Sequence, residues 1–464
     1  MKKFAVVGAG ISGLSHAYYL RKQIPDSEVD IFEFSHWGGV ISTRRHKEVI
    51  FEAGPEAYLM RTPLLLQLTK ELQLENELIR ASKESATRYI VKEGRLVKLP
   101  TGPLGFLFNS VLFFPEKIKV LLAFRKKFNL WQNMSVFDAV KSMSTMTAAE
   151  YFASAFCRGV FGSEAEDLEF AAILPELYSA IRKEDSLAKA MKKVAHEKKA
   201  YWEKELGENA YHGFEKGLVS FRGGLETLTT KLKDFLKEDH LSHIRQSKVS
   251  SLHKSGSKYL LHSKGQKYGS YDAVFLAIPA KQAAEILRNE NKETATLLQK
   301  MQYSPITVVV CGWDKKNFSA KGFGFISPRK ENLPILGTQF VSNIFAGRAP
   351  ENQFVTKTMI AGDNTLFSDD ELAERVLSAH KRLYKISAGP LWYEVIHYKQ
   401  GLPRYFLGYT EWKQNVLEKL NQFSGRQNLF LCGWNYDGIG LPHALEKAYL
   451  RVKEFATTWK EDSK

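Results

Sequence analysis

Three glycines near the start of the chain have the spacing of a phosphate-binding turn. They form a GxGxxG pattern over residues 8–13, directly after the apolar run 4–7. Residues 14–21 continue with apolar side chains on one face of a helix. In a strand, turn and helix of this kind, backbone N–H groups and the positive end of the helix dipole lie against a pyrophosphate. The predicted phosphate contacts are Gly8, Gly10, Ile11, Ser12 and Gly13.

A carboxylate at the end of the next predicted strand favours a dinucleotide. Residues 28–32 are typical of a buried strand, and Glu33 follows, twenty residues after Gly13. An acid at this position accepts hydrogen bonds from ribose hydroxyls and repels a 2′-phosphate, so NADP is disfavoured. The alternative is a glycine-rich turn without a ligand, but three glycines at a helix entry lower stability unless something uses them.

Two further segments distinguish FAD from NAD. The glycine pair 38–39 and the Gly-Pro at 54–55 resemble the extended nucleotide motif of the amine-oxidase-like FAD superfamily. A buried strand at 428–433, a loop and a helix at 444–455 are similar to the closing segment of that superfamily. The resemblance implies that FAD is the cofactor and that this helix points its N-terminus at the isoalloxazine ring. The further cofactor contacts that it implies are Phe34, Gly38, Gly39, Val40, Gly54, Pro55, Val249, Gly433, Trp434, Ile439, Gly440 and Leu441.

The middle of the chain narrows the resemblance to the protoporphyrinogen oxidase family. The segments that carry it are 94–102, 158–162, 221–228, 271–280, 322–325 and 402–405. The "LPTG" of the first and the "RGVFG" of the second make the narrower assignment, because segments like 221–228 and 271–280 also occur in amine oxidases and carotenoid desaturases. The chain departs from the family at Glu56, where an arginine is common, and in the closing loop at 441–445.

The resemblance implies a reaction in haem biosynthesis. Protoporphyrinogen IX, with four methylene bridges, would lose six electrons to become protoporphyrin IX. FAD would be reduced three times and reoxidised by dioxygen, with release of hydrogen peroxide. The alternatives are coproporphyrinogen III as the substrate, another amine-oxidase-like flavin oxidase or desaturase, or a flavin-binding protein without activity.

Four residues are implied in substrate binding by the same resemblance. Arg88 would hold a propionate, since a guanidinium pairs bidentately with a carboxylate; the alternative is a surface arginine on a strand. Gly159 would let the backbone approach the macrocycle, and the alternative is a helix-ending glycine. Phe323 and Ile326 would clamp the ring faces, and the alternative is a strand packed in the core.

No side chain is predicted to be a catalytic acid or base. Loss of a pyrrole proton from an oxidised ring is easy, so the reaction could proceed without one. His443, just before the C-terminal helix, is interpreted as a capping or packing residue rather than a base. The twelve histidines show no metal-ligand spacing, so no metal is predicted.

The expected fold class is α/β, with a Rossmann-type FAD-binding domain, a β-rich substrate domain and a helical membrane-associating insertion. The FAD-binding domain is expected to gather residues 1–84, 215–295 and 405–464. Residues 85–94 and 296–404 would form the substrate domain, and 95–214 the insertion. A chain of 464 residues is long enough for two or three such domains.

Charge and composition limit the partners. Sixty-six basic against 51 acidic residues give a net charge of +15, which favours anionic lipid or a polycarboxylate substrate. Nucleic acid is disfavoured because no basic arm or aromatic–basic pattern is present. Three isolated cysteines indicate buried thiols in a reducing compartment.

The helical insertion is the part expected to meet a membrane. Apolar runs at 106–108 and 111–114 precede Lys117, Lys119 and the basic cluster 125–127. Apolar side chains beside cations suit an interfacial helix, and no stretch is long enough to span a bilayer. We therefore expect a cytoplasmic protein at the periphery of the cytoplasmic membrane; the alternative is a soluble helical lid, and a homodimer is left open.

Overall fold

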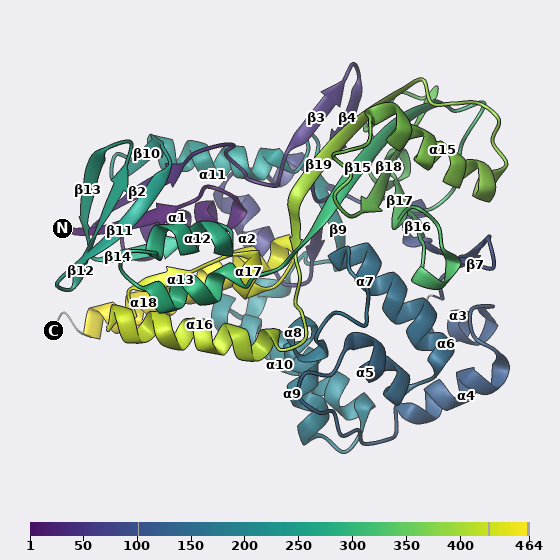
Figure 1. Cartoon of the computed structure of the whole chain (residues 1–464), viewed down its shortest axis with the longest axis horizontal. Coiled ribbons are helices and arrows are strands. Elements are labelled where there is room, and N and C mark those ends of the chain that lie inside the picture. Colours follow the sequence, from purple (N-terminus) through teal and green to yellow (C-terminus); the bar gives the residue numbers. More distant parts are fainter. Residues whose placement is uncertain (101, 426, 462–464) are drawn as a thin grey trace.

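The computed structural model describes residues 1–100, 102–425 and 427–461. Figure 1 shows three regions: a parallel sheet layered with helices on the left, a long antiparallel sheet at the upper right and a group of helices at the lower right. Thr101 of the "LPTG" stretch lies outside the described residues.

A five-stranded parallel sheet forms the first region. Its order is β10-β2-β1-β14-β20. The strands are β1 (Lys2–Val7), β2 (Ser27–Glu33), β10 (Ser242–Gln246), β14 (Ala273–Leu276) and β20 (Leu429–Leu431). Their sequences are near-continuous apolar runs because both faces of the sheet are covered. The sheet therefore contains strands from near both ends of the chain.

Helices cover one face of this sheet, and a small sheet with further helices covers the other. On the first face lie α1 (Ile11–Gln23), α2 (Leu64–Glu71), α11 (Glu226–Glu238) and α18 (Leu441–Glu461). On the second lie the antiparallel strands β11 (Val249–Ser255), β12 (Lys258–Ser263) and β13 (Gln266–Tyr271), with α12 (Ala280–Leu287), α13 (Lys292–Gln299) and α16 (Tyr409–Ser424). This layering is the doubly covered parallel sheet that the sequence predicted.

The second region is a seven-stranded sheet of order β19-β15-β18-β17-β16-β7-β8. Its strands are β7 (Tyr89–Lys92), β8 (Arg95–Lys98), β15 (Tyr303–Asp314), β16 (Gly324–Ile326), β17 (Gly337–Phe340), β18 (Gln353–Ala361) and β19 (Trp392–Pro403). Only the β7–β16 pairing is parallel; the other pairs are antiparallel. Because β8 belongs to this sheet, residues 95–98 at the start of the predicted insertion lie with the strands.

One long helix, α15 (Asp369–Tyr384), covers one face of the seven-stranded sheet. Ser368 and Glu371 cap its first turn reciprocally, and Lys385 ends it in a left-handed conformation. The opposite face meets β4 (Val49–Glu52), whose apolar side chains pack against those of β15. Both faces of β15 are therefore buried.

Helices dominate the third region. They are α3 (Gly102–Phe108), α4 (Phe114–Ala123), α5 (Val136–Met143), α6 (Met146–Ala148), α7 (Ser154–Phe161), α8 (Phe170–Ile173), α9 (Pro175–Lys183) and α10 (Leu187–Leu206), with a π turn, η3 (Ala149–Ala153), before α7. In the part of the chain that is described, no helix combines the length and apolarity needed to cross a bilayer.

Short elements complete the chain. They are β3 (Thr43–His46), β5 (Tyr58–Met60), β6 (Leu78–Arg80), β9 (Gly217–Phe221), α14 (Val341–Ile344), α17 (Trp434–Asp437) and the 3₁₀ turns η1 (Glu75–Glu77), η2 (Glu84–Ala86), η4 (Glu208–Tyr211) and η5 (Arg329–Glu331). The three cysteines are buried free thiols, as the sequence indicated.

His380, on α15, gives the second region a dependence on pH. Its ring is fully buried, with Nε2 3.1 Å from the Thr338 hydroxyl, and burial lowers its pKa from 6.5 to about 3. Below pH 6.5 the unfolded chain therefore binds a proton at His380 that the folded chain does not bind. His380 thus leaves the fold unaffected above pH 6.5 and destabilises it increasingly as pH falls toward 3.

We expect His380→Gln to lose less stability on acidification than the wild type. The difference in unfolding free energy between the two proteins should shift by about 2 kcal/mol in favour of the variant from pH 7.5 to 5.0, because only the wild type carries the histidine titration. Urea unfolding at both pH values measures this shift. Equal losses in the two proteins would contradict a neutral buried His380.

Candidate active site

The first strand–helix turn is built by close backbone contacts. A Cβ on Gly13 would lie 1.8 Å from the Gly8 carbonyl oxygen, and Gly8 has a left-handed φ of +96°. The first turn of α1 has neither a side-chain cap nor an acid. Its N–H groups are therefore available to an anion, as the GxGxxG spacing predicted.

The loop after β2 lies against this turn. The Gly38 N–H donates to the Ala9 carbonyl at 2.8 Å, and a Cβ on Gly39 would lie 3.0 Å from the Gly10 Cα. Gly54 in turn approaches Val40, because its Cβ would lie 2.0 Å from the Val40 carbonyl oxygen. The predicted cofactor residues from 8 to 54 thus form one continuous backbone cradle.

Glu33 is fixed at the end of β2 by two backbone donors. Its carboxylate accepts from the Ala9 N–H at 2.7 Å and from the Ser35 N–H at 2.6 Å. Each oxygen retains a lone pair for a ribose hydroxyl. The Ser247 N–H donates to the Glu33 carbonyl at 2.8 Å, which places Val249 two residues beyond. The Phe34 ring is exposed.

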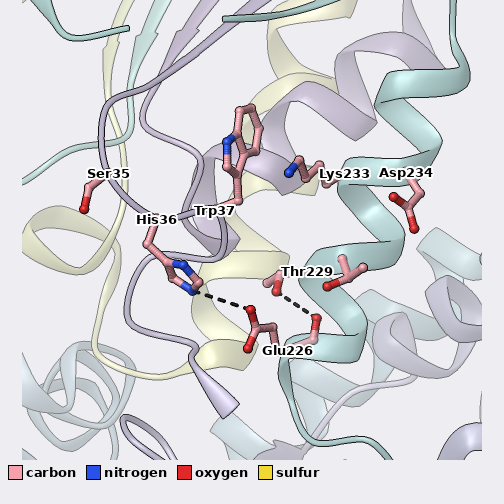
Figure 2. Close-up of a pocket in the computed structure, with 8 residues that line it drawn as sticks. Ser35, His36, Trp37, Glu226, Thr229, Lys233 and Asp234 are labelled. Carbon is pink, nitrogen blue, oxygen red and sulfur yellow. Dashed lines mark hydrogen bonds and ion pairs between the residues drawn. The ribbon is translucent and has the colours of Figure 1, made fainter. Parts of the chain in front are cut away.

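A hollow of about 260 Å³ lies beside the loop that follows Glu33 (Figure 2). Its lining residues are Ser35, His36, Trp37, Glu226, Thr229, Thr230, Lys233 and Asp234. The His36 ring is 3.6 Å from the Glu226 carboxylate, and the Lys233 ammonium lies 4.9 Å from the centre of the Trp37 ring. Sequence reasoning missed the part of this lining that comes from α11 beyond the segment 221–228, namely Thr229, Thr230, Lys233 and Asp234.

The closing loop reaches the first turn from the other end of the chain. A Cβ on Gly433 would lie 3.8 Å from the Ser12 side chain, and the buried Ser12 hydroxyl has no partner among the described residues. An unpaired buried hydroxyl beside free helix N–H groups suits a phosphate oxygen. Trp434 and Ile439 are half-buried, and Leu441 is buried at the start of α18.

A buried ionic chain, absent from the sequence-based predictions, shapes the closing loop. The Asp437 carboxylate accepts from the Gly433 N–H at 2.7 Å and from the Arg451 guanidinium at 2.6 Å. Burial alone would raise the pKa of Asp437, but Arg451 and the Gly433 N–H hold it below its ordinary value. Arg451 also donates to His16, whose pKa burial and then the Arg451 charge lower to about 3.

Three tyrosines also hold the closing loop, and of these only Tyr405 lies in a segment that carries the family resemblance. Tyr303 donates to the Asn435 side chain, while Tyr405 and Tyr409 donate to the Trp434 and Asn435 carbonyls. His443 lies in the first turn of α18, and its Nδ1 donates to the Ile439 carbonyl of the closing loop at 2.9 Å.

The four predicted substrate residues meet at one end of the seven-stranded sheet. The Arg88 guanidinium lies 4.9 Å from the centre of the Phe323 ring, and the Phe323 N–H donates to the Thr87 carbonyl. A Cβ on Gly159 would lie 2.7 Å from Ile326 Cδ1. Three segments far apart in sequence, which carry Arg88, Gly159 and 323–326, thus lie beside one another around β16.

The position of Gly159 excludes the alternative that this glycine ends a helix. It lies inside α7, and the residue that ends the helix in a left-handed conformation is Gly162. Arg158 Nε donates to the Ser327 carbonyl at 2.8 Å and holds α7 against β16. Arg88 is exposed, so its role in substrate binding stays a prediction.

Comparison with known proteins identifies the family. The model of the flavin containing amine oxidoreductases matches residues 11–452. The chain belongs to this family. It is 24% identical to the coproporphyrinogen III oxidase of Staphylococcus aureus (strain NCTC 8325 / PS 47), with 98% of each chain covered. It is 26% identical to the protoporphyrinogen oxidase of Dictyostelium discoideum, over 97% of this chain and 98% of the relative.

Solved structures show the same fold. A crystal structure from Exiguobacterium sp. 255-15 aligns with a TM-score of 0.78 at 21% identity, over 98% of this chain and 99% of the other. A reduced UDP-galactopyranose mutase aligns with a TM-score of 0.70 at 13% identity, over 99% and 94%. The amine-oxidase-like α/β fold predicted from the sequence is therefore confirmed, and so is an FAD-dependent oxidoreductase.

The contact between Gly39 and Gly10 gives a test of the FAD cradle. We expect Gly39→Ala to weaken FAD binding at least about tenfold, because the added methyl strains a left-handed residue and presses on Gly10. Flavin absorbance per mole of purified protein and titration of the apoprotein measure this. Gly94→Ala is the matched control: Gly94 has a φ of +71°, but a Cβ there meets nothing within 4 Å. Equal flavin loss in both variants would contradict the cradle.

Proposed function

We propose that this family member oxidises a porphyrinogen in haem biosynthesis. The observation that carries the proposal is that Arg88 lies against Phe323 and Gly159 lies against Ile326, within or directly before the same short strand β16. Relatives named coproporphyrinogen III oxidase and protoporphyrinogen oxidase, matched over nearly the whole chain, support it. We propose protoporphyrinogen IX as the substrate, with coproporphyrinogen III as the alternative.

One set of residues would bind FAD, and another would bind and orient the substrate. When bound, FAD accepts two electrons as a hydride and passes them to an acceptor, which we propose is dioxygen, with release of hydrogen peroxide. The first turn of α1, the Ser12 hydroxyl and Glu33 would hold its dinucleotide part. Arg88 would pair with a propionate, while Ile326 and Phe323 would exclude water from the ring faces.

Anaerobic mixing with each porphyrinogen tests the function. We expect the flavin absorbance to bleach, and porphyrin fluorescence to develop when air is admitted. Bleaching by a polyamine and by neither porphyrinogen would mean a different oxidase of the family. The substrate with the larger kcat/KM settles the choice between the two.

Arg88→Ala should raise KM about ten- to a hundredfold with a smaller change in kcat, because the lost ion pair contributes to binding of substrate and transition state alike. Arg95→Ala is the control, since Arg95 is an exposed arginine on the neighbouring strand β8. Steady-state fluorescence assays provide both constants, and a KM unchanged in Arg88→Ala would remove Arg88 from the site.

We also propose that the helical region docks on an anionic membrane surface from the cytoplasm. Large apolar side chains are exposed on α3, α4 and their connection: Leu107, Phe108, Phe113, Phe114, Ile118, Leu121 and Leu122. Lys119 and residues 125–127 lie exposed beside them. Lys117, predicted as part of this cationic surface, is instead buried, with its ammonium donating to the Leu107 and Asn109 carbonyls. The division into three domains stays a prediction.

The double substitution Phe108→Ser/Phe114→Ser should reduce membrane binding about tenfold, because these side chains are 85% and 68% exposed and would bury in the interface. Sedimentation with phosphatidylserine-containing vesicles measures the effect, and added salt should weaken the wild type. Leu366→Ser, at a 95% exposed leucine outside the helical region, is the control. Equal binding by the wild type and the double variant would contradict this docking surface.

A further inference from the structure

Glu56 and Lys357 form a buried ion pair between the cofactor cradle and the seven-stranded sheet. Lys357 Nζ donates to Glu56 Oε2 at 2.5 Å and to the Glu52 and Gly54 carbonyls at 3.1 and 3.0 Å. The two side chains are 2% and 3% exposed. All three ammonium protons of Lys357 are therefore engaged, and Glu56 Oε2 is held in place.

The other oxygen of Glu56 has no donor. Glu56 Oε1 is buried and has no hydrogen-bond partner within the described ranges, and the same holds for Gln339 Oε1. An unpaired buried acceptor destabilises the folded protein. Lys357, the partner of Glu56, stands opposite Gln339 in the sheet, so the two unpaired oxygens together indicate a ligand that brings N–H or O–H donors.

The sheet register places Lys357 and Gln339 on the face that carries Ile326, which we call the substrate face. Lys357 on β18 stands opposite Gln339 on β17, and Gln339 stands opposite Gly324 on β16. Residues paired in this way share a face, and so does Ile326, two residues beyond Gly324. Lys357 is two strand spacings, about 10 Å, from the β16 strand that contacts Gly159.

Other buried glutamates are less suited to receive a proton in this site. Both oxygens of Glu52 are occupied, by the Leu225 N–H at 2.8 Å and by the Thr43 hydroxyl at 2.9 Å. Glu169 also has an unpartnered oxygen, counted over the described residues, but it lies at the start of α8, and its other oxygen accepts from the Thr410 N–H. Glu56 alone of these adjoins both the cofactor cradle and the substrate face.

We propose that Glu56 accepts a hydrogen bond, and then the proton, from a pyrrole N–H of the bound porphyrinogen. This inference rests on the proposed function. In the first oxidation a meso C–H bond breaks and its electron pair leaves as a hydride to the bound FAD. The meso carbon gains a C=C bond to the pyrrole ring, and the π lone pair of the pyrrole nitrogen forms the new C=N bond. The N–H bond breaks, its electron pair stays on nitrogen, and the proton goes to Glu56 Oε1. Lys357 keeps the carboxylate in place, and the proton passes to water before the next round.

Anaerobic stopped-flow bleaching of Glu56→Gln tests the proposal. At saturating porphyrinogen we expect the rate constant to fall about a hundredfold or more, while the half-saturating concentration changes less than about threefold. Formate should restore part of the rate in Glu56→Ala, which a merely structural role would not produce. Protoporphyrin binding, followed by fluorescence, should weaken about tenfold in Glu56→Ala.

Glu169→Gln is the matched control, because it neutralises another buried glutamate with a free oxygen, and its rate should equal that of the wild type. If Glu56→Gln does not hold FAD, the double variant Glu56→Gln/Lys357→Met removes both charges of the pair and should restore folding. A rate within threefold of the wild type in whichever variant holds FAD would overturn the proposal. A wild type that bleaches with neither porphyrinogen would overturn the proposed function itself, and the two failures are thus distinct.

Discussion

A methyl group on Gly13 would lie 1.8 Å from the Gly8 carbonyl oxygen, and one on Gly8 would lie 2.4 Å from the carbonyl oxygen of Ala277. These contacts bring α1, β1 and the end of β14 closer together than any side chain permits. Gly39 reaches the same turn at Gly10, where there is no side chain, and Gly433 lies beside Ser12. The substrate face is then held against the cradle by β4 and its following loop.

The junction between the cradle and the seven-stranded sheet carries an unusual number of buried charges. Glu52, Glu56, Arg348 and Lys357 are all less than a tenth exposed. Arg348 donates to the Ser220 hydroxyl and the Phe221 carbonyl, and lies 3.9 Å from Glu52. Burial and then the Glu56 charge raise the pKa of Glu52 to about 7. Removing one partner of such a group costs far more than replacing a whole pair, so the junction is sensitive to single substitutions.

Much of the predicted nucleotide-binding region could be recognised from the sequence because its motifs lie close together in the chain. The strand, glycine turn, helix and acid lie within the first 33 residues, and β1, α1 and β2 form as the spacing indicated. Glu56 was recognised as a departure from the family, but its partner Lys357 is 301 residues away, and no local pattern links the two. Lys117 was assigned to the surface from charge alone, whereas backbone carbonyls bury it. Side-chain partners of this kind arise from tertiary packing, which periodicity does not report.

Strand β20 and helix α18 come last in the chain, yet β20 pairs with β14 and α18 packs along α1. During synthesis the ribosome therefore releases the first strand and its glycine turn long before the residues that complete their sheet exist. The nascent chain must carry an open sheet edge and an uncovered face of α1 until more than four hundred residues have been made. FAD therefore binds only after most of the polypeptide has been synthesised. Premature termination would leave an exposed apolar surface for chaperones and proteases to recognise.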